Sequence, residues 1–159
     1  VNIPVGVDNG DRVRLAGKGE AGINGGPSGD LFVRIKVKKH KIFERKGNNL
    51  YCDVPISFAI AALGGNVEVP TLSGSVVNVK IPSGTQSSKL FRLKGKGIKP
   101  VRGGGIGDMM CVIHIETPLN LSNEQADLLR EFDEKINQSY SKHSPRTQSW
   151  VDAIKNIFN

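Results

Sequence analysis

Cysteine and histidine are scarce in this sequence, which argues against a metal centre. Its 159 residues include two cysteines and three histidines. Cys52 and Cys111 are far apart in the sequence, and neither has another cysteine or a histidine at ligand spacing. Cys111 falls at an apolar strand position, so we predict a buried free thiol there. We therefore expect no metal, no structural disulfide and no cofactor in this chain.

Long apolar runs are absent as well. No segment approaches the about eighteen consecutive apolar residues of a membrane span, and no charged and apolar leader opens the chain. Hydrophobic residues make up 38% and charged residues 23%, which is ordinary for a soluble protein. We therefore expect a cytoplasmic protein without a membrane partner.

Aromatic residues are few, whereas glycine and proline are frequent. Aromatics make up 6% of the chain, against 19 glycines and 8 prolines, which favours a turn-rich β protein. The formal net charge is +7, and residues 80–102 hold seven basic side chains and no acidic one. Tyrosine and tryptophan are not interleaved with these basic runs, so the stacking platform of single-strand binders is missing. We predict no nucleic-acid partner and keep a basic nucleic-acid-binding β protein as an alternative.

No group of residues in the sequence suggests catalysis. His40, His114 and His143 are scattered, and no serine or cysteine has an evident base and orienting acid. Residues 17–22 have the glycine spacing of a dinucleotide-binding turn, but residues 23–29 contain three glycines and a proline. No helix can follow to hold a pyrophosphate at its N-terminus. We predict that the chain is not an enzyme.

The clearest positive feature is an internal repeat. Residues 1–6 align with residues 79–84, an offset of 78 residues, and the register continues without a gap to Ile35 and Ile113. By eye there are about 14 identities over about 39 positions, mostly Gly, Pro and Asp, so a backbone plan was duplicated. Two tandem modules fit this long period better than a solenoid. Only the second copy is preceded by further strands, within residues 49–75, so the first module looks truncated. Because the chain also opens on Val instead of Met, we interpret it as a fragment of a longer protein.

The repeat contains alternating apolar and polar residues that are typical of half-buried strands. They occur at residues 31–38 and again at 109–116, and Asp30 and Asp108 mark the two strand entrances. We expect these carboxylates to accept backbone donors from the preceding glycine loops. Shorter strands are predicted at residues 1–3, 12–15, 50–54, 66–69, 75–81 and 89–93, with a hairpin turn at residues 73–74. A short helix is predicted from Ser57, which caps it, to Gly64, which ends it.

Two helices are predicted after residue 118. Ser122 and Gln125 form a capping box for a helix that should run to about Gln138. Residues 139–148 are interpreted as a polar linker, and Ser149 as the cap of a last short helix. That helix carries an apolar stripe formed by Trp150, Ile154, Ile157 and Phe158. Because an isolated short helix is marginal in water, this one needs a surface to pack on.

A strand edge offers a second possible interaction site. A small β module can accept an extended peptide as an added strand, with shallow apolar pockets for its side chains. Phe43, just after the first long strand, is the best pocket residue. The alternative is that Phe43 belongs to a core or plugs a contact between domains.

An ordered series of motifs resembles the C-terminal region of bacterial DnaJ, the J-domain co-chaperone of DnaK. The motifs lie at residues 4–10, 15–17, 29–31, 40–45, 48–51, 61–65, 69–72 and 95–97. The resemblance implies a mainly β fold with two tandem β-sandwich-like modules and a C-terminal helical dimerisation segment. It places these parts at residues 1–45, 46–121 and 122–159. It also implies a homodimer that binds exposed hydrophobic segments of unfolded client polypeptides and delivers them to DnaK.

The resemblance also carries over site residues. Phe43 matches a groove phenylalanine of the relatives, and Ile3, Val13 and Leu15 are carried over as peptide-binding neighbours by their position in the repeat. Trp150, Ile154, Ile157 and Phe158 are the expected dimerisation residues. The J-domain His-Pro-Asp triplet is missing, so no ATPase stimulation is expected. The four Cys-x-x-Cys pairs are missing too, so zinc is expected only upstream of this chain. An assembly module without client binding is the remaining alternative.

Overall fold

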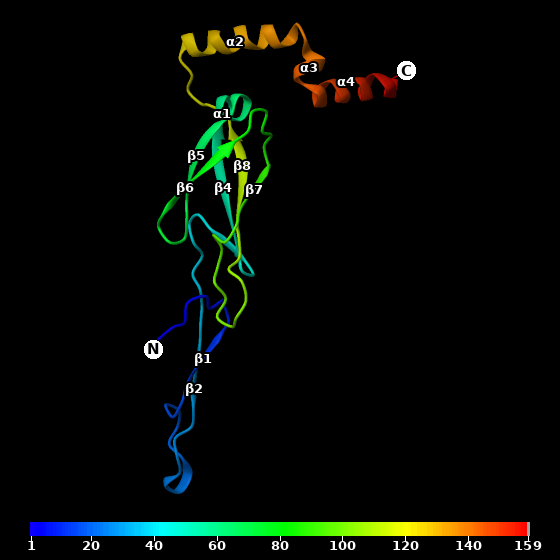
Figure 1. The fold of residues 1–159 in the computed structure, drawn as a ribbon. Coiled ribbons are helices and arrows are strands. Elements are labelled where there is room, and N and C mark those ends of the chain that lie inside the picture. The colour runs from blue at the N-terminus through cyan, green and yellow to red at the C-terminus, as the bar shows by residue number, and fades with distance from the viewer. Residues whose placement is uncertain (159) are drawn as a thin grey trace. The chain divides into compact units, whose positions relative to one another are not determined.

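The computed structural model describes residues 1–158, which form two compact units, of which the first is Val1–Thr117 and the second begins at Pro118 (Figure 1). The first unit is strand-rich and the second is helical, as predicted. In chain order the first unit contains β1 (Arg12–Leu15), η1 (Ile23–Gly25), β2 (Leu31–Arg34), β3 (Glu44–Lys46), β4 (Asn49–Ser57), α1 (Phe58–Leu63), β5 (Gly65–Pro70), β6 (Val76–Ile81), β7 (Leu90–Leu93) and β8 (Met109–Glu116). The second contains α2 (Asn123–Asn137), α3 (Tyr140–His143) and α4 (Pro145–Phe158). Within residues 1–158 no helix has the length and apolarity needed to span a membrane.

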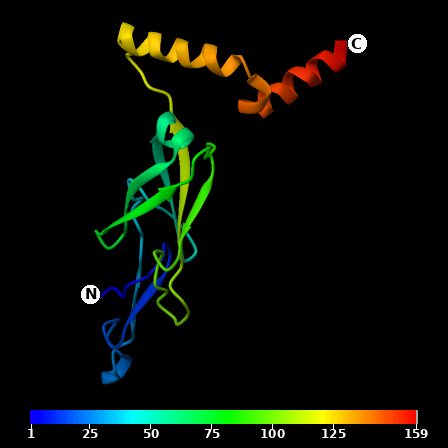
Figure 2. The ribbon, with the colours of Figure 1, turned by 45° about the horizontal axis from the view of Figure 1, so that its top comes forward.

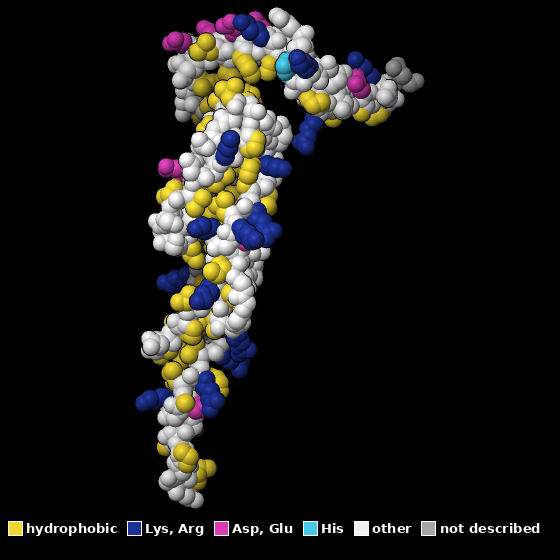
Figure 3. Space-filling view, viewed as in Figure 1, with side chains coloured by type: hydrophobic (Ala, Val, Ile, Leu, Met, Phe, Trp, Pro, Cys, Tyr) yellow, Lys and Arg dark blue, Asp and Glu magenta, His cyan; other side chains and the backbone are white. Residues whose placement is uncertain are grey.

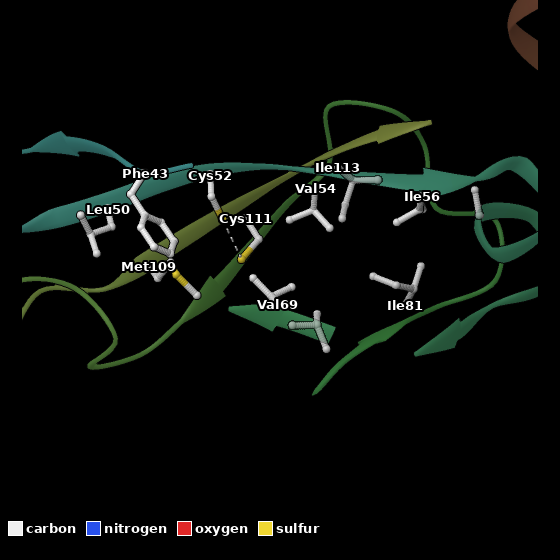
Figure 4. Close-up of a cluster of buried hydrophobic side chains, with 12 residues drawn as sticks. Phe43, Leu50, Cys52, Val54, Ile56, Val69, Ile81, Met109, Cys111 and Ile113 are labelled. Carbon is white, nitrogen blue, oxygen red and sulfur yellow. Dashed lines mark hydrogen bonds between the residues drawn. The ribbon is translucent and has the colours of Figure 1, made fainter. Parts of the chain in front are cut away.

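The second copy of the repeat is part of a complete two-layer module. Strands β3, β4, β8 and β7 form one sheet in that order, with β4 and β8 parallel, and the β5–β6 hairpin forms a second sheet (Figure 2). Alternate residues of β4 are buried, as expected for a strand with one covered face. The core lies between the two sheets and includes Ile56, Val69, Ile81 and Ile113 (Figure 4).

Local capping signals define α1 and the hairpin that follows it. The Ser57 side chain accepts a hydrogen bond from the Ile60 backbone N–H, and Gly64 ends the helix with a φ of 83°. Strands β5 and β6 pair in an antiparallel hairpin around the predicted turn, with Pro70 opposite Val76. The sequence predictions of this helix and this hairpin are therefore confirmed.

The two copies share their strand register. In β1 and β2, Arg12 lies opposite Arg34 and Leu15 opposite Leu31. The residues 78 positions later pair in the same way, because β7 and β8 place Leu90 opposite Val112 and Leu93 opposite Met109. The two hairpins therefore have the same backbone plan, as the repeat predicts.

Two strand predictions in the first copy are wrong. Residues 1–3 form no strand, although their counterparts 79–81 belong to β6. In the second copy β6 pairs with β5, whereas no strand of the described residues 1–158 pairs with residues 1–3. Strand β2 ends at Arg34 instead of near residue 38. Backbone pairing continues only to Ile35, whose N–H donates to the Asp11 carbonyl and whose carbonyl accepts from the Gly10 N–H. A strand without a neighbour leaves its backbone groups unpaired and loses its regular conformation.

The helices of the second unit confirm one prediction and correct another. Ser122 and Gln125 form the capping box of α2, and Gln138 is its C-cap. The segment predicted as a polar linker is instead helical, because α3 lies in it and α4 begins at Pro145. Proline suits the first turn of a helix, where its missing N–H has no partner to lose. Ser149 is therefore not a cap, and its hydroxyl donates to the Pro145 carbonyl one turn earlier.

Candidate functional site

Asp30 and Asp108 hold the glycine loops of the two copies in the same way. In the first copy Asp30 accepts hydrogen bonds from the Gly17 N–H, at 3.0 Å, and from the Arg14 side chain, at 2.6 Å. In the second copy Asp108 accepts from the Gly95 N–H, at 2.8 Å, and from Arg92. The structural role predicted for both carboxylates is confirmed.

The environment of Asp108 favours its ionised form. The hydrogen bond from the Gly95 backbone lowers the pKa of Asp108 below its usual value, and the Arg92 side chain lowers it further, against a smaller opposing effect of burial. The Asp108 side chain is 11% exposed, compared with 25% for Asp30. These groups stabilise loops, and nothing in their geometry suggests catalysis.

One face of the β1–β2 hairpin is apolar and only partly covered. Val13, Leu15, Leu31 and Val33 share this face because they pair in register and alternate with polar residues. Leu31 is 44% exposed, whereas its counterpart Met109 is fully buried. Figure 3 shows hydrophobic side chains reaching the surface along this part of the first unit. The structure therefore brings together two of the predicted peptide-binding residues, Val13 and Leu15.

In the second copy the same face is covered by a hairpin. Val69, Val79 and Ile81 of β5 and β6 pack in the core with Met109 and the neighbouring residues of β8 (Figure 4). The edge of β8 is also paired with β4 along its length. Within residues 1–158, β2 pairs only with β1, so its other edge is open.

Ile3 lies outside the β1–β2 strands and is 57% exposed, whereas its counterpart Ile81 is 1% exposed. Ile81 lies in β6, which pairs with β5, whereas residues 1–3 form no strand. No described contact joins Ile3 to the apolar face of the hairpin, so its role in peptide binding stays a prediction.

Phe43 belongs to the core of the second module. Its side chain is 8% exposed and lies beside Leu50 and Met109 in Figure 4. His40 fixes the approach of this segment, because its Nδ1 accepts hydrogen bonds from the Ile42 and Phe43 N–H groups. Of the two positions that the sequence allowed, the structure places Phe43 in a core. Its contact with a client peptide stays a prediction.

Arg45 of β3 joins the sheet of the second module to the first copy of the repeat, a contact that sequence reasoning missed. Its guanidinium donates to the carbonyl oxygens of Val7, at 2.7 Å, and Gly6, at 3.0 Å. A side chain at Gly6 would collide with the backbone of the loop at Lys99. The recurrence of a glycine at positions 6 and 84 was the only signal in the sequence, because the contact joins residues far apart along the chain.

The helices of the second unit carry exposed apolar residues. Trp150 is 66% and Ile157 is 76% exposed, and they share one face of α4 with the half-buried Ile154. The predicted dimerisation residue Phe158 ends α4, but its side chain lies outside the described part. In α2, Leu128 is exposed and no residue is buried. None of the residues described as the hydrophobic core comes from this unit.

The opposite face of the β1–β2 hairpin is basic. Arg12 and Arg34 lie directly opposite each other, and a hollow of about 310 Å³ is lined by Asn9, Gly10, Arg34, Ile35 and Lys36. Such a surface can attract an anion. Among residues 1–158, no three or more His, Cys, Asp and Glu side chains are grouped to hold a metal ion.

The comparison with protein-family models agrees with this architecture. The model of the DnaJ C terminal domain matches residues 1–118, which are most of the chain and include both copies of the repeat. That family consists of chaperone substrate-binding domains and is not an enzyme family. The chain therefore belongs to the DnaJ C-terminal domain family.

Proposed function

We propose that this chain binds exposed hydrophobic segments of unfolded polypeptides, delivers them to DnaK, and forms a homodimer through its C-terminal helices. The client site is the apolar face of β1–β2 together with the open edge of β2. The observation that supports it is the contrast between Leu31 and Met109, which occupy the same place in the repeat with very different burial.

The physical argument rests on burial and on backbone pairing. A client segment over the hairpin would remove the apolar side chains of Val13, Leu15 and Leu31 from water, which stabilises the complex in proportion to the area covered. An extended client can also pair with the open edge of β2, because main-chain hydrogen bonds do not depend on its sequence. Both interactions suit a site that must accept many different clients.

The experiment compares two neighbouring residues on opposite faces of β2. Binding of a fluorescently labelled, permanently unfolded model protein to the whole chain is followed by anisotropy. We expect Leu31→Ser to weaken binding by about tenfold, since burying a leucine contributes about 1.5–3 kcal/mol. Phe32→Ser is the matched control, because Phe32 is 58% exposed and lies on the basic face.

Two results would contradict this proposal. Equal losses from Leu31→Ser and Phe32→Ser would move the site away from the apolar face. Binding that collapses when salt is raised would instead favour the nucleic-acid-binding alternative, because phosphate contacts weaken steeply with ionic strength and apolar contacts do not. The anisotropy titration is therefore repeated at low and high salt.

Dimerisation is supported by the second unit. The described residues of the helical unit contribute nothing to the hydrophobic core, and most helix stability in proteins comes from packing an apolar face. In a homodimer the stripe of Trp150, Ile154 and Ile157 would pack on the partner, which would bury the residues that are exposed in the single chain.

Sedimentation across a dilution series tests the dimer. We expect Ile157→Asp to shift the chain to monomer at concentrations where the wild type is dimeric, since it places a charge in the interface. Asn156→Asp adds the same charge at an exposed polar neighbour and should leave the dimer intact. A dimer that survives Ile157→Asp but is lost with Leu128→Asp would move the interface to α2.

A further inference from the structure

Cys52 and Cys111 meet at the centre of the second module. Strands β4 and β8 are parallel neighbours, and their register places Cys52 directly opposite Cys111. The two sulfur atoms are 3.7 Å apart, both thiols are free, and both are buried, with exposed fractions of 3% and 1% (Figure 4). The proposed client site does not use this pair.

The geometry is close to that of a disulfide. Adjacent strands are about 4.7–4.9 Å apart, which lies within the range of Cα separations that a disulfide tolerates. Both side chains point to the core side of the sheet, so the sulfurs need to approach by only about 1.7 Å from their separation of 3.7 Å. No strand has to change its register for this bond to form.

We propose that Cys52 and Cys111 form a dithiol–disulfide modification site, in which a peroxide that enters when the β5–β6 hairpin opens cross-links β4 to β8. In the closed module Val69 and Ile81 of this hairpin cover the core side of the sheet, where the two thiols lie. Buried cysteines are normally inert because oxidants cannot reach them. Opening of the hairpin is therefore the step that controls the reaction.

The environment decides which thiol reacts first. The hydrogen bond with Cys111 lowers the pKa of Cys52, whereas the same interaction and burial raise the pKa of Cys111. The thiolate is the nucleophile in this chemistry. These directions favour Cys52 as the attacking thiol, and the 3.7 Å between the two sulfur atoms places Cys111 to attack the product.

The reaction balances with one peroxide for each pair of thiols. The Cys52 thiolate attacks a peroxide oxygen, the O–O bond breaks, and the leaving hydroxide takes up the Cys52 proton to form water, which gives a sulfenic acid. The Cys111 sulfur then attacks the Cys52 sulfur, the S–O bond breaks, and the second hydroxide leaves with the Cys111 proton as water. The two sulfurs together lose two electrons, which reduce the peroxide.

The disulfide would stabilise the folded second module. Cys52 and Cys111 are 59 residues apart, and the loop between them contains α1, β5, β6 and β7. A cross-link over so long a loop removes many conformations from the unfolded chain and stabilises the folded one. Oxidation during a transient opening would therefore preserve the folded module afterwards.

Hydrogen peroxide treatment of the whole chain, followed by intact-mass and peptide mapping, tests the site. We expect a mass loss equal to two hydrogen atoms and a peptide that links Cys52 to Cys111. Val69→Ala should form this cross-link at least about tenfold faster, because it loosens the hairpin over the thiols. Val76→Ala is the matched control on the same hairpin, since Val76 is 59% exposed, and its rate should equal that of the wild type.

Urea unfolding provides the second measurement. The oxidised wild type should show a higher midpoint that returns to the original value after treatment with a thiol reductant, and Cys52→Ala should show neither change. The proposal is overturned by equal oxidation rates in Val69→Ala and wild type, or by a lower midpoint after oxidation. It is also overturned if wild type held in mild urea, where the hairpin opens more often, still forms only sulfinic or sulfonic acids.

Discussion

The two copies of the repeat have the same backbone plan but very different burial. Six backbone hydrogen bonds of the first copy recur 78 residues later, among them Gly19 N–H to Gly29 carbonyl and its counterpart Gly97 N–H to Gly107 carbonyl. Yet the second copy has a core and the first has an open apolar face. The comparison teaches that glycines and a carboxylate set the backbone path of each hairpin, whereas packing by other strands decides whether its apolar side chains are buried or exposed.

The largest expected difference between the copies concerns the core. Met109→Ala should lower the free energy of unfolding by about 2–5 kcal/mol, because it leaves a cavity at a fully buried position. Leu31→Ala, at the equivalent position, should cost less than about 1 kcal/mol, since surface substitutions usually have small effects. Urea unfolding followed by circular dichroism measures both. Similar losses would show that Leu31 is covered in solution, most simply by a second molecule.

A smaller difference is expected at a pair of equivalent glycines. A Cβ at Gly107 would overlap the backbone of Asn48, whereas a Cβ at Gly29 would lie 3.8 Å from its nearest non-adjacent neighbour, the Glu20 carbonyl oxygen. Gly107→Ala should therefore destabilise the second module by about 1–3 kcal/mol, the usual cost of overpacking. Gly29→Ala should be nearly neutral. If Gly29→Ala were equally harmful, the loop of the first copy would be covered by a segment that residues 1–158 do not supply.

The smallest effect is a difference in pH dependence. Because the folded state lowers the pKa of Asp108, its carboxylate stabilises the fold fully above the unfolded pKa, about 3.9, and loses this contribution as pH falls towards the lowered folded value. The stability difference between wild type and Asp108→Asn should thus be largest above about pH 5 and shrink in acid. Unfolding midpoints between pH 2 and 7 check this. Asp30→Asn should lower the free energy of unfolding by less than Asp108→Asn, because the Asp30 side chain is more exposed to water. Equal losses would show that the two carboxylates stabilise their loops to the same extent.

Features that depend on neighbours in sequence could be predicted from the sequence. The caps at Ser57 and Ser122 place a side-chain oxygen next to N–H groups of the first turn, so they need no tertiary partner. The roles of Asp30 and Asp108 were predictable because their donors lie in the adjoining glycine loop. The tandem repeat and its register followed mainly from recurring glycines, which mark positions where the backbone adopts conformations that other residues disfavour.

Features that depend on distant neighbours could not be predicted. The sequence left Phe43 between a binding pocket and a core, because its burial depends on Leu50 and Met109. The helical conformation of α3 and of the first turn of α4 was hidden by polar residues and by Pro145, which is compatible with both a linker and a helix start. The clamp of Arg45 on Gly6 and Val7 joins residues for which the sequence shows no periodic pattern.

The sequence by itself determined the duplicated hairpin, its glycine loops and its caps, because these rest on backbone conformations and hydrogen bonds that are local. Only the tertiary structure decided that the second copy has a core and the first an open apolar face, and that Cys52 faces Cys111. Burial and the pairing of β4 with β8 depend on which strands lie side by side, and that choice is made by the packing of the whole module.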